Sequence, residues 1–105
     1  MTDQVLVVTT TDSQDEAQTI ARHLIEQRLA ACVQLLGPVE SVYWWEGRIE
    51  TAQEWQCIAK SSQDLFSSIE SAIREIHSYD VPEILAFPIV EGSAPYLAWM
   101  RDQLK

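Results

Sequence analysis

Basic residues are scarce in this sequence of 105 residues. Seven Lys and Arg stand against sixteen Asp and Glu, so the formal net charge is −9 at pH 7. Proteins that bind nucleic acids or anionic membrane surfaces need clusters of cationic side chains to meet the phosphates. The composition therefore predicts neither a nucleic acid nor a membrane as a partner. The excess of carboxylates suits solubility and a weak, non-specific attraction for cations.

Long hydrophobic runs and a recognisable targeting segment are missing as well. No stretch reaches the roughly 18 consecutive apolar residues of a membrane span. Residues 1–4 include no basic residue, and the apolar run of residues 5–8 is too short for the core of a signal peptide. We therefore expect a cytoplasmic location.

Cysteine and glycine are both rare. Cys32 and Cys57 form no Cys-x-x-Cys motif, so neither a zinc site nor a redox motif is indicated, and both are expected as free thiols in the core. The three glycines form no phosphate-binding loop. Neither Gly-x-Ser-x-Gly nor His-Glu-x-x-His is present, which argues against a hydrolase. We expect no enzymatic activity and no required cofactor.

The patterns that are present predict a single domain, residues 1–105, in which strands alternate with helices. Apolar runs at 5–8 and 84–87 predict two buried strands, and residues 32–60 predict two more. Pro88 limits the length of the strand at 84–87 or puts it at the edge of the sheet. A Ser13 cap precedes a helix with this buried stripe: Ala17, Ile20, Ala21, Leu24 and Ile25. A second amphipathic helix follows Ser61, and a short third helix follows Ser93. This order is that of the ferredoxin-like α+β sandwich, β-α-β-β-α-β with an added C-terminal helix.

Residues 32–60 are predicted to form one long hairpin with an aromatic tip. Tyr43-Trp44-Trp45 favours a strand, and Glu46-Gly47 permits a tight turn. Gly37-Pro38 predicts a bulge or bend in the first arm. The arm is long for a chain of this size, and helices on one face leave the other face of the sheet uncovered. Both features predict self-association, for which a closed trimer is one solution.

Five segments resemble the CutA divalent-cation-tolerance family. They are Leu29-Ala30-Ala31-Cys32, Val42-Tyr43-Trp44-Trp45-Glu46-Gly47, Lys60, His77-Ser78-Tyr79-Asp80-Val81-Pro82-Glu83 and Tyr96-Leu97-Ala98-Trp99. Together they extend over nearly the whole chain. The resemblance implies a ferredoxin-like homotrimer, similar in architecture to the PII signalling proteins. It also implies a role in tolerance of copper and other divalent cations, with no established enzymatic activity.

The resemblance further implies a ligand cleft between subunits. The residues that we expect around it are Cys32, Trp45, Glu54, Lys60, Tyr79 and Glu83. Lys60, near the start of a predicted helix, is a candidate for holding an anion, and an ion pair between subunits is the other interpretation. The alternative function is therefore a PII-like sensor that binds a small anionic ligand or a partner protein in such clefts.

His77 is the candidate metal ligand. Family members proposed to bind copper carry a Cys at the end of the first strand and a His-His pair before the Tyr of the loop. This chain has Thr9 and Ile76-His77 at those places, and Thr is a poor ligand for soft metals. Copper is therefore expected to bind weakly and not as a required cofactor. The other interpretations of His77 are a histidine that braces the end of a helix and a catalytic base.

Overall fold

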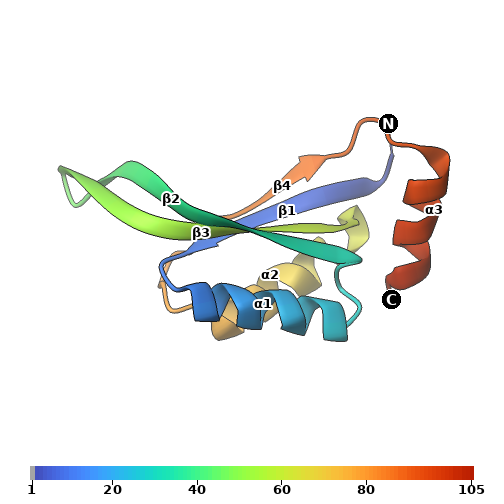
Figure 1. The fold of residues 1–105 in the computed structure, drawn as a ribbon, viewed down its shortest axis with the longest axis horizontal. Helices are drawn as coiled ribbons and strands as arrows, with labels where there is room; N and C mark the ends of the chain where they lie inside the picture. Colours follow the sequence, from blue (N-terminus) through green and yellow to red (C-terminus); the bar gives the residue numbers. More distant parts are fainter. Residues whose placement is uncertain (1) are drawn as a thin grey trace.

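A four-stranded antiparallel sheet carries the fold in the computed structural model, which describes residues 2–105 (Figure 1). The elements are β1 (Gln4–Thr11), α1 (Gln14–Glu26), β2 (Cys32–Trp45), β3 (Arg48–Ser62), the 3-10 turn η1 (Gln63–Leu65), α2 (Phe66–Ile76), β4 (Ile84–Pro88) and α3 (Ala94–Gln103). The strand order is β2-β3-β1-β4, and all neighbours are antiparallel. The predicted α+β class and order of elements are confirmed.

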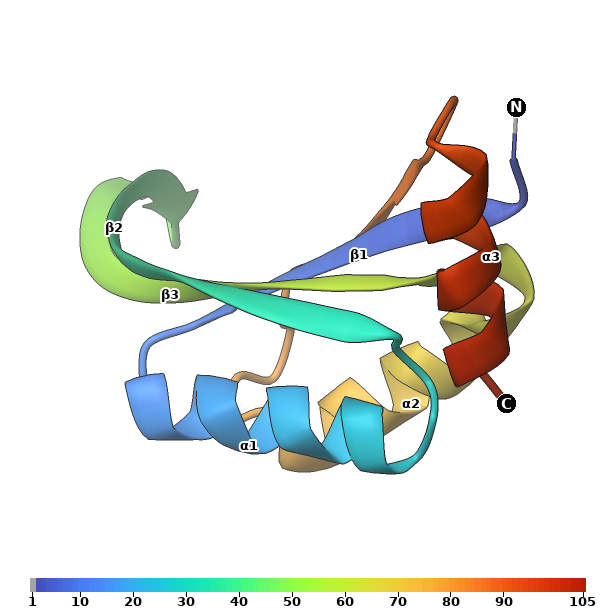
Figure 2. The same ribbon diagram turned by 45° about the vertical axis from the view of Figure 1, so that its right-hand side comes forward.

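The core lies between the sheet and the two main helices, which cover the same face (Figure 2). Side chains of a strand alternate between faces, and β1 turns Val5 and Val7 toward the helices. The helix residues that meet them are Ala17, Ile20 and Leu24 of α1 and Ile69, Ala72 and Ile73 of α2. None of the helices within residues 2–105 has the length and apolar character needed to cross a lipid bilayer.

Helix α1 begins where the capping pattern places it. Ser13 Oγ accepts a hydrogen bond from the backbone N–H of Glu16 at 3.1 Å. The predicted buried stripe is wrong at its last member, because Ile25 remains 42% exposed. Ile25 follows Leu24 and lies at the margin of the stripe, where the helix surface turns away from the sheet.

Strand β4 takes the edge position that Pro88 permits, but it is not the buried strand that its apolar run predicts. It lies at the edge of the sheet, with Leu85 51% and Phe87 50% exposed. These side chains stand opposite Val8 and Leu6 of β1, on the face that no main helix covers. A short apolar run looks the same in sequence whether one or both of its faces are covered, which explains the error.

The β2–β3 hairpin extends well beyond the sheet core (Figure 1), and its outer half curls away from the helices (Figure 2). It turns at Glu46 and Gly47, whose φ angles of 50° and 78° are left-handed. The pairing register shifts between Leu36 and Val39, at the predicted interruption. Trp44 is 71% exposed, so the tip has no cover within residues 2–105.

The sheet face opposite α1 and α2 is apolar, and we call it the open face. The cross-strand pairs place six apolar side chains on it: Leu6, Val8, Leu36, Ile58, Leu85 and Phe87. All six are half-buried or exposed. Helix α3 stands at one end of the sheet and leaves most of this face uncovered (Figure 2).

Candidate functional site

A cavity of about 730 Å³ lies between the outer hairpin and the loop that precedes β4. We call it the hairpin cavity. Its walls carry four carboxylates, Asp12, Glu54, Asp80 and Glu83, and three aromatic rings, Tyr43, Trp45 and Tyr79. Thr10, Ser41, Val42, Ala52 and Val81 complete the lining. An acidic wall with aromatic surfaces suits a cationic ligand better than an anionic one.

Strand geometry brings the hairpin side chains together. Tyr43 and Trp45 are two residues apart on β2 and therefore share a face. Ser41 stands opposite Ala52 in the register, and Glu54 follows two residues later on β3. The curl of the outer hairpin is therefore what shapes this side of the cavity.

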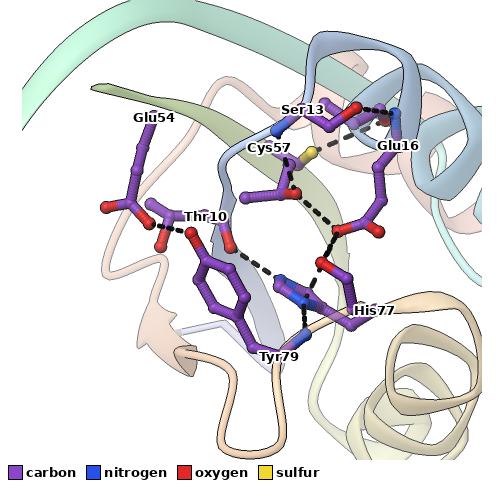
Figure 3. Close-up of polar contacts among 10 residues, drawn as sticks. Thr10, Ser13, Glu16, Glu54, Cys57, His77 and Tyr79 are labelled. Atoms are coloured by element: carbon purple, nitrogen blue, oxygen red, sulfur yellow. Dashed lines mark hydrogen bonds and ion pairs between the residues drawn. The ribbon is translucent and has the colours of Figure 1, made fainter. Parts of the chain in front are cut away.

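Tyr79 and Glu54 join the two sides of the cavity. The Tyr79 hydroxyl donates to Glu54 Oε2 at 2.8 Å, and Glu54 is only 7% exposed (Figure 3). Burial, then the hydrogen bond to Glu54 and the charge of that carboxylate, raises the pKa of Tyr79 above its ordinary value. The phenol therefore remains a hydrogen-bond donor at neutral pH and does not serve as a base.

His77 positions the loop that carries Tyr79 (Figure 3). The Tyr79 backbone N–H donates to His77 Nδ1 at 3.1 Å, so Nδ1 is an acceptor. The proton is then on Nε2, which donates to the Thr10 carbonyl at 2.7 Å. The backbone N–H of His77 also donates to the Ile73 carbonyl, which ends α2. This is the geometry of a bracing histidine.

Glu16 lies beside this histidine and joins three segments. Its Oε2 accepts from Thr11 Oγ1 at 2.5 Å and from Ser78 Oγ at 3.2 Å, and it lies 3.6 Å from His77 Nδ1. Glu16 therefore ties the start of α1 to the end of β1 and to the loop after α2.

The residues at the copper positions that the resemblance to CutA implies do not fit a copper centre in one chain. Thr9 is buried, and its hydroxyl has no hydrogen-bond partner among residues 2–105. Both ring nitrogens of His77 already make hydrogen bonds. Within the described residues, no three His, Cys, Asp or Glu side chains lie close enough to hold one metal ion. Metal ligation by His77 stays a prediction, and it requires a nitrogen to give up its present partner.

The six predicted cleft residues divide into two groups within the chain. The hairpin cavity brings together Trp45, Glu54, Tyr79 and Glu83, whereas Cys32 and Lys60 do not line it. Cys32 and Lys60 stand opposite one another in the β2–β3 register, six residues of β3 beyond Glu54, or about 20 Å. A cleft that contains all six residues therefore needs a second copy of the chain.

Lys60 lies within β3, close to the predicted helix start, which is a 3-10 turn capped by Ser62. Strand β3 continues through Ser62, and η1 intervenes before α2 begins. The Lys60 ammonium donates to the Tyr96 hydroxyl at 3.2 Å and lies 5.2 Å from the centre of that ring. The capping pattern Ser61-Ser62-Gln63-Asp64 predicts a helix start at Ser61, but pairing with β1 continues through Ser62.

The two cysteines have different surroundings, and both are free thiols. Cys57 is buried and its thiol donates to the Ala17 carbonyl at 3.7 Å. Burial, and then the charge of Glu16, raises the pKa of Cys57 to about 11. Cys32 is half-buried on β2. Cys57 is therefore a core thiol, whereas Cys32 is the more accessible of the two.

Sequence reasoning misses Asp12 and Tyr43 as lining residues. Tyr43 is two positions from Trp45, and this alternation is a signal that the two rings share a face. Asp12 has no such signal, because its place depends on how the end of β1 meets the curled hairpin.

Comparison with known proteins relates this arrangement to a bacterial protein. The divalent-cation tolerance protein CutA of Thermus thermophilus is 39% identical over 97 residues, which are 92% of this chain and 94% of that protein. The solved structure of the Thermus thermophilus protein superimposes with a TM-score of 0.95 and covers 97% of this chain and 99% of that one.

Two other relatives correct the expected cytoplasmic location. The rice protein CutA 1, 35% identical over 96% of this chain, is chloroplastic, and this chain spans 57% of its length. The Archaeoglobus fulgidus CutA structure, with a TM-score of 0.94 at 36% identity and coverage of 97% and 99% of the two chains, is of a periplasmic protein. The prediction of a purely cytoplasmic location is therefore wrong. The same fold occurs in several compartments, so charge and hydropathy near residue 1 do not fix the location.

A family model also matches nearly the whole chain. The model described as CutA1 divalent ion tolerance protein matches residues 5–103. That span includes most of β1, all of the hairpin, the loop between α2 and β4, and α3. The chain therefore belongs to the CutA1 divalent ion tolerance family.

Proposed function

We propose that this chain acts in tolerance of divalent cations as a non-enzymatic homotrimer. The match of residues 5–103 to the family model is the observation that carries the role in cation tolerance. Deleting the gene is expected to reduce growth in raised copper, and returning the wild-type gene to restore it. Equal growth of the deleted and the parent cells across a copper series would contradict the proposal.

The open face supports the homotrimer. Leu85 and Phe87 at its edge are each about half exposed, and further apolar side chains continue the surface across the sheet. Three chains around one axis give every open face a partner, in the manner of a PII-like assembly. In such a trimer a neighbouring copy supplies Cys32 and Lys60 to the cleft that one chain leaves incomplete.

Light scattering coupled to gel filtration tests the assembly. We expect the mass of three chains, and we expect Phe87→Asp to dissociate them because it puts a charge on the open face. Ile25→Asp is the matched control, since Ile25 is similarly exposed but lies on α1. A wild-type monomer, or equal dissociation by both variants, would contradict this assembly.

Direct copper binding is proposed to be weak. The His77 ring already uses both nitrogens, and Thr9 offers only a hydroxyl where a soft metal favours thiolate. Calorimetric titration with copper is expected to give weak binding that His77→Gln leaves nearly unchanged. Strong binding that disappears in His77→Gln would establish the imidazole as a ligand instead.

A PII-like sensor for an anionic ligand is not favoured. The cavity walls of one chain carry four carboxylates, which one Lys60 from a neighbouring copy would not outweigh. A thermal-shift screen against nucleotides and carboxylic acids is expected to show no stabilisation. A reproducible shift that Lys60→Gln removes would restore this alternative.

A further inference from the structure

Helix α3 lies outside the hydrophobic core that the sheet shares with α1 and α2. None of the described residues in that core belongs to α3, and Met100 is the one buried residue among Ala94–Gln103. Tyr96 and Trp99 of this helix are each 42% exposed. An element with little buried apolar surface opens at a lower free energy than the core does. The attachment of α3 therefore depends largely on polar contacts.

Gln4 attaches the first half of α3 to the open face. Its side-chain Nε2 donates to the Leu97 carbonyl at 2.9 Å, and Gln4 itself is 0% exposed. The Oε1 atom of the same amide is buried, with no hydrogen-bond partner among residues 2–105. A buried acceptor without a partner costs free energy, and opening of α3 would let water reach it. The closed position of α3 therefore carries a cost that opening removes.

Arg28 attaches the other end of α3. Its guanidinium Nη1 donates to the Gln103 carbonyl at 3.0 Å, and its own carbonyl accepts the Lys105 backbone N–H at 2.9 Å. The φ angle of Arg28 is 56°, a left-handed conformation in which glycine is the favoured residue.

The turn after α1 explains the backbone of Arg28 but not its side chain. The backbone N–H groups of Arg28 and Leu29 donate to the Ile25 and Leu24 carbonyls at 3.0 and 2.9 Å, which is a Schellman motif. Glycine satisfies this motif without strain. A larger residue in such a conformation indicates a role for its side chain, and here the side chain holds the last turn of α3.

We infer that α3 is a strap that opens and closes over one end of the open face while the sheet stays folded. The hinge is the segment between β4 and α3, which includes Gly92, and Arg28 is the clasp at the free end. Figure 2 shows α3 standing against that end of the sheet, with the C-terminus near the turn that follows α1.

Closure of the strap fixes the ammonium group of Lys60. The hydroxyl of Tyr96, in the first turn of α3, accepts its hydrogen bond at 3.2 Å, and the ammonium lies 5.2 Å from the centre of that ring. Opening of α3 removes both contacts and frees the lysine side chain. In the proposed homotrimer, on which this last step alone depends, Lys60 completes the cleft of a neighbouring copy. The strap then controls how this cation is presented to the cleft.

Hydrogen exchange of the assembled protein, followed residue by residue by NMR, tests the strap. We expect the amides of residues 97–103 to exchange together and at least about tenfold faster than those of β1. Their exchange should depend little on urea, because local opening exposes little surface. Exchange as slow as that of β1 would mean that α3 opens only with global unfolding. Progressive fraying from the last residue would mean that it does not open as a unit, and either result overturns the strap.

A matched pair of variants tests the clasp. Arg28→Gly removes the guanidinium and suits the left-handed turn, so the variant is expected to fold. Arg22→Ala removes the same charge from an exposed position on α1. We expect Arg28→Gly to speed exchange in α3 by about three- to tenfold, as for one lost hydrogen bond, and Arg22→Ala to leave it unchanged. Equal exchange of α3 in Arg28→Gly and in the wild type would refute the clasp.

Acetylation by dilute acetic anhydride, measured by mass spectrometry, tests the link to Lys60. The chain has two lysines, and Lys105 is exposed, so it serves as the internal reference. We expect Arg28→Gly to raise the acetylation rate of Lys60 relative to the wild type, and an unchanged rate would contradict the link. Light scattering and growth in copper test the homotrimer and the cation-tolerance role separately, because the contacts of Gln4 and Arg28 lie within one chain.

Discussion

His77 connects three segments through one buried imidazole ring. It donates to the Thr10 carbonyl and accepts from the Tyr79 backbone N–H, and its own side chain is 0% exposed. The ring thereby fixes the loop that presents Tyr79 to Glu54. This histidine shapes the hairpin cavity without lining it.

Replacing His77 by Ala is expected to lower the free energy of unfolding by about 2 to 4 kcal/mol. The variant leaves a buried carbonyl and a buried N–H without partners, whereas His77→Gln retains an amide donor and is expected to lose less. Urea denaturation measures both. His23→Ala is the control, because His23 is half-buried beside α2 and makes no side-chain hydrogen bond among the described residues, and it should change stability by about 1 kcal/mol or less. Equal losses for Ala at His77 and at His23 would refute the bracing role.

The raised pKa of Cys57 predicts a loss of stability in alkali. Well below pH 9.0 the thiol is protonated in both states and contributes nothing to the difference. Between pH 9.0 and about 11 the unfolded chain loses the proton while the folded chain keeps it, so the free energy of unfolding falls. Denaturation at stepped pH should show this fall, and Cys57→Ala should make it shallower. Parallel pH profiles for the two proteins would argue against a buried, protonated thiol.

Among the site residues, sequence reasoning reached those with a local signature. The motif around Tyr79 and Glu83 and the aromatic run at Trp45 can be recognised from neighbouring residues alone. Asp12 cannot, because its place in the cavity depends on the curl of a hairpin that begins 20 residues later. The exposure of Ile25 depends on how much of the α1 surface the sheet covers, and the periodicity of apolar residues does not determine this.

At the level of elements, the long hairpin depends on a close contact at its bend. A Cβ atom added to Gly37 would lie less than 3.0 Å from Cδ1 of the Trp55 indole ring, so one of the two residues would have to move. At Gly47 the same atom would meet nothing within 4 Å, although the φ of 78° disfavours a side chain. Gly37 is therefore required because there is no space for a side chain, whereas Gly47 is favoured because of its backbone conformation.

We expect Gly37→Ala to destabilise the protein by about 1 to 3 kcal/mol through overpacking. Gly47→Ala should cost only the strain of its left-handed backbone, about 1 kcal/mol. Thermal and urea unfolding measure both, and Trp55→Val should remove most of the additional penalty at Gly37. If Trp55→Val gives no relief, the contact with the indole ring is not the cause.

The order of elements could be predicted because each signal is local. A cap at Ser13, a turn at Glu46-Gly47 and periods of two or 3.6 residues follow from adjacent side chains. The exposure of β4 could not be predicted in this way, because it depends on which sheet faces the helices cover. The continuation of β3 through Ser62 depends likewise on pairing with β1.

At the level of the whole molecule, the exposed hairpin tip is a second apolar surface that favours self-association. Trp44 stands opposite Ile49 in the hairpin, and they are 71% and 66% exposed. Large apolar side chains in neighbouring positions are typical of a protein interface. In the proposed homotrimer this pair packs against a second copy.

Trp44→Ala is therefore expected to raise the protein concentration at which the trimer dissociates by at least about tenfold, because an aromatic side chain at the centre of an interface often contributes this much. Sedimentation at decreasing protein concentration measures the dissociation. Glu46→Ala, at the same tip but without a large apolar side chain, should dissociate as the wild type does. If Trp44→Ala and Trp45→Ala both leave the dissociation unchanged, the hairpins do not hold the subunits together.

The strand order leaves β2 and β4 as the two outer strands of the sheet. Each has one row of backbone donors and acceptors free to pair with any extended chain, so an isolated protomer can add neighbours without limit. Pro38 and Pro88 each lack an N–H, which shortens the pairing that such growth can use. Closing the proposed trimer therefore has a second effect besides burying the open face, because it limits pairing at the outer strands. In the proposed homotrimer a closed ring ends at three chains, whereas open pairing of the same edges would continue into a fibre.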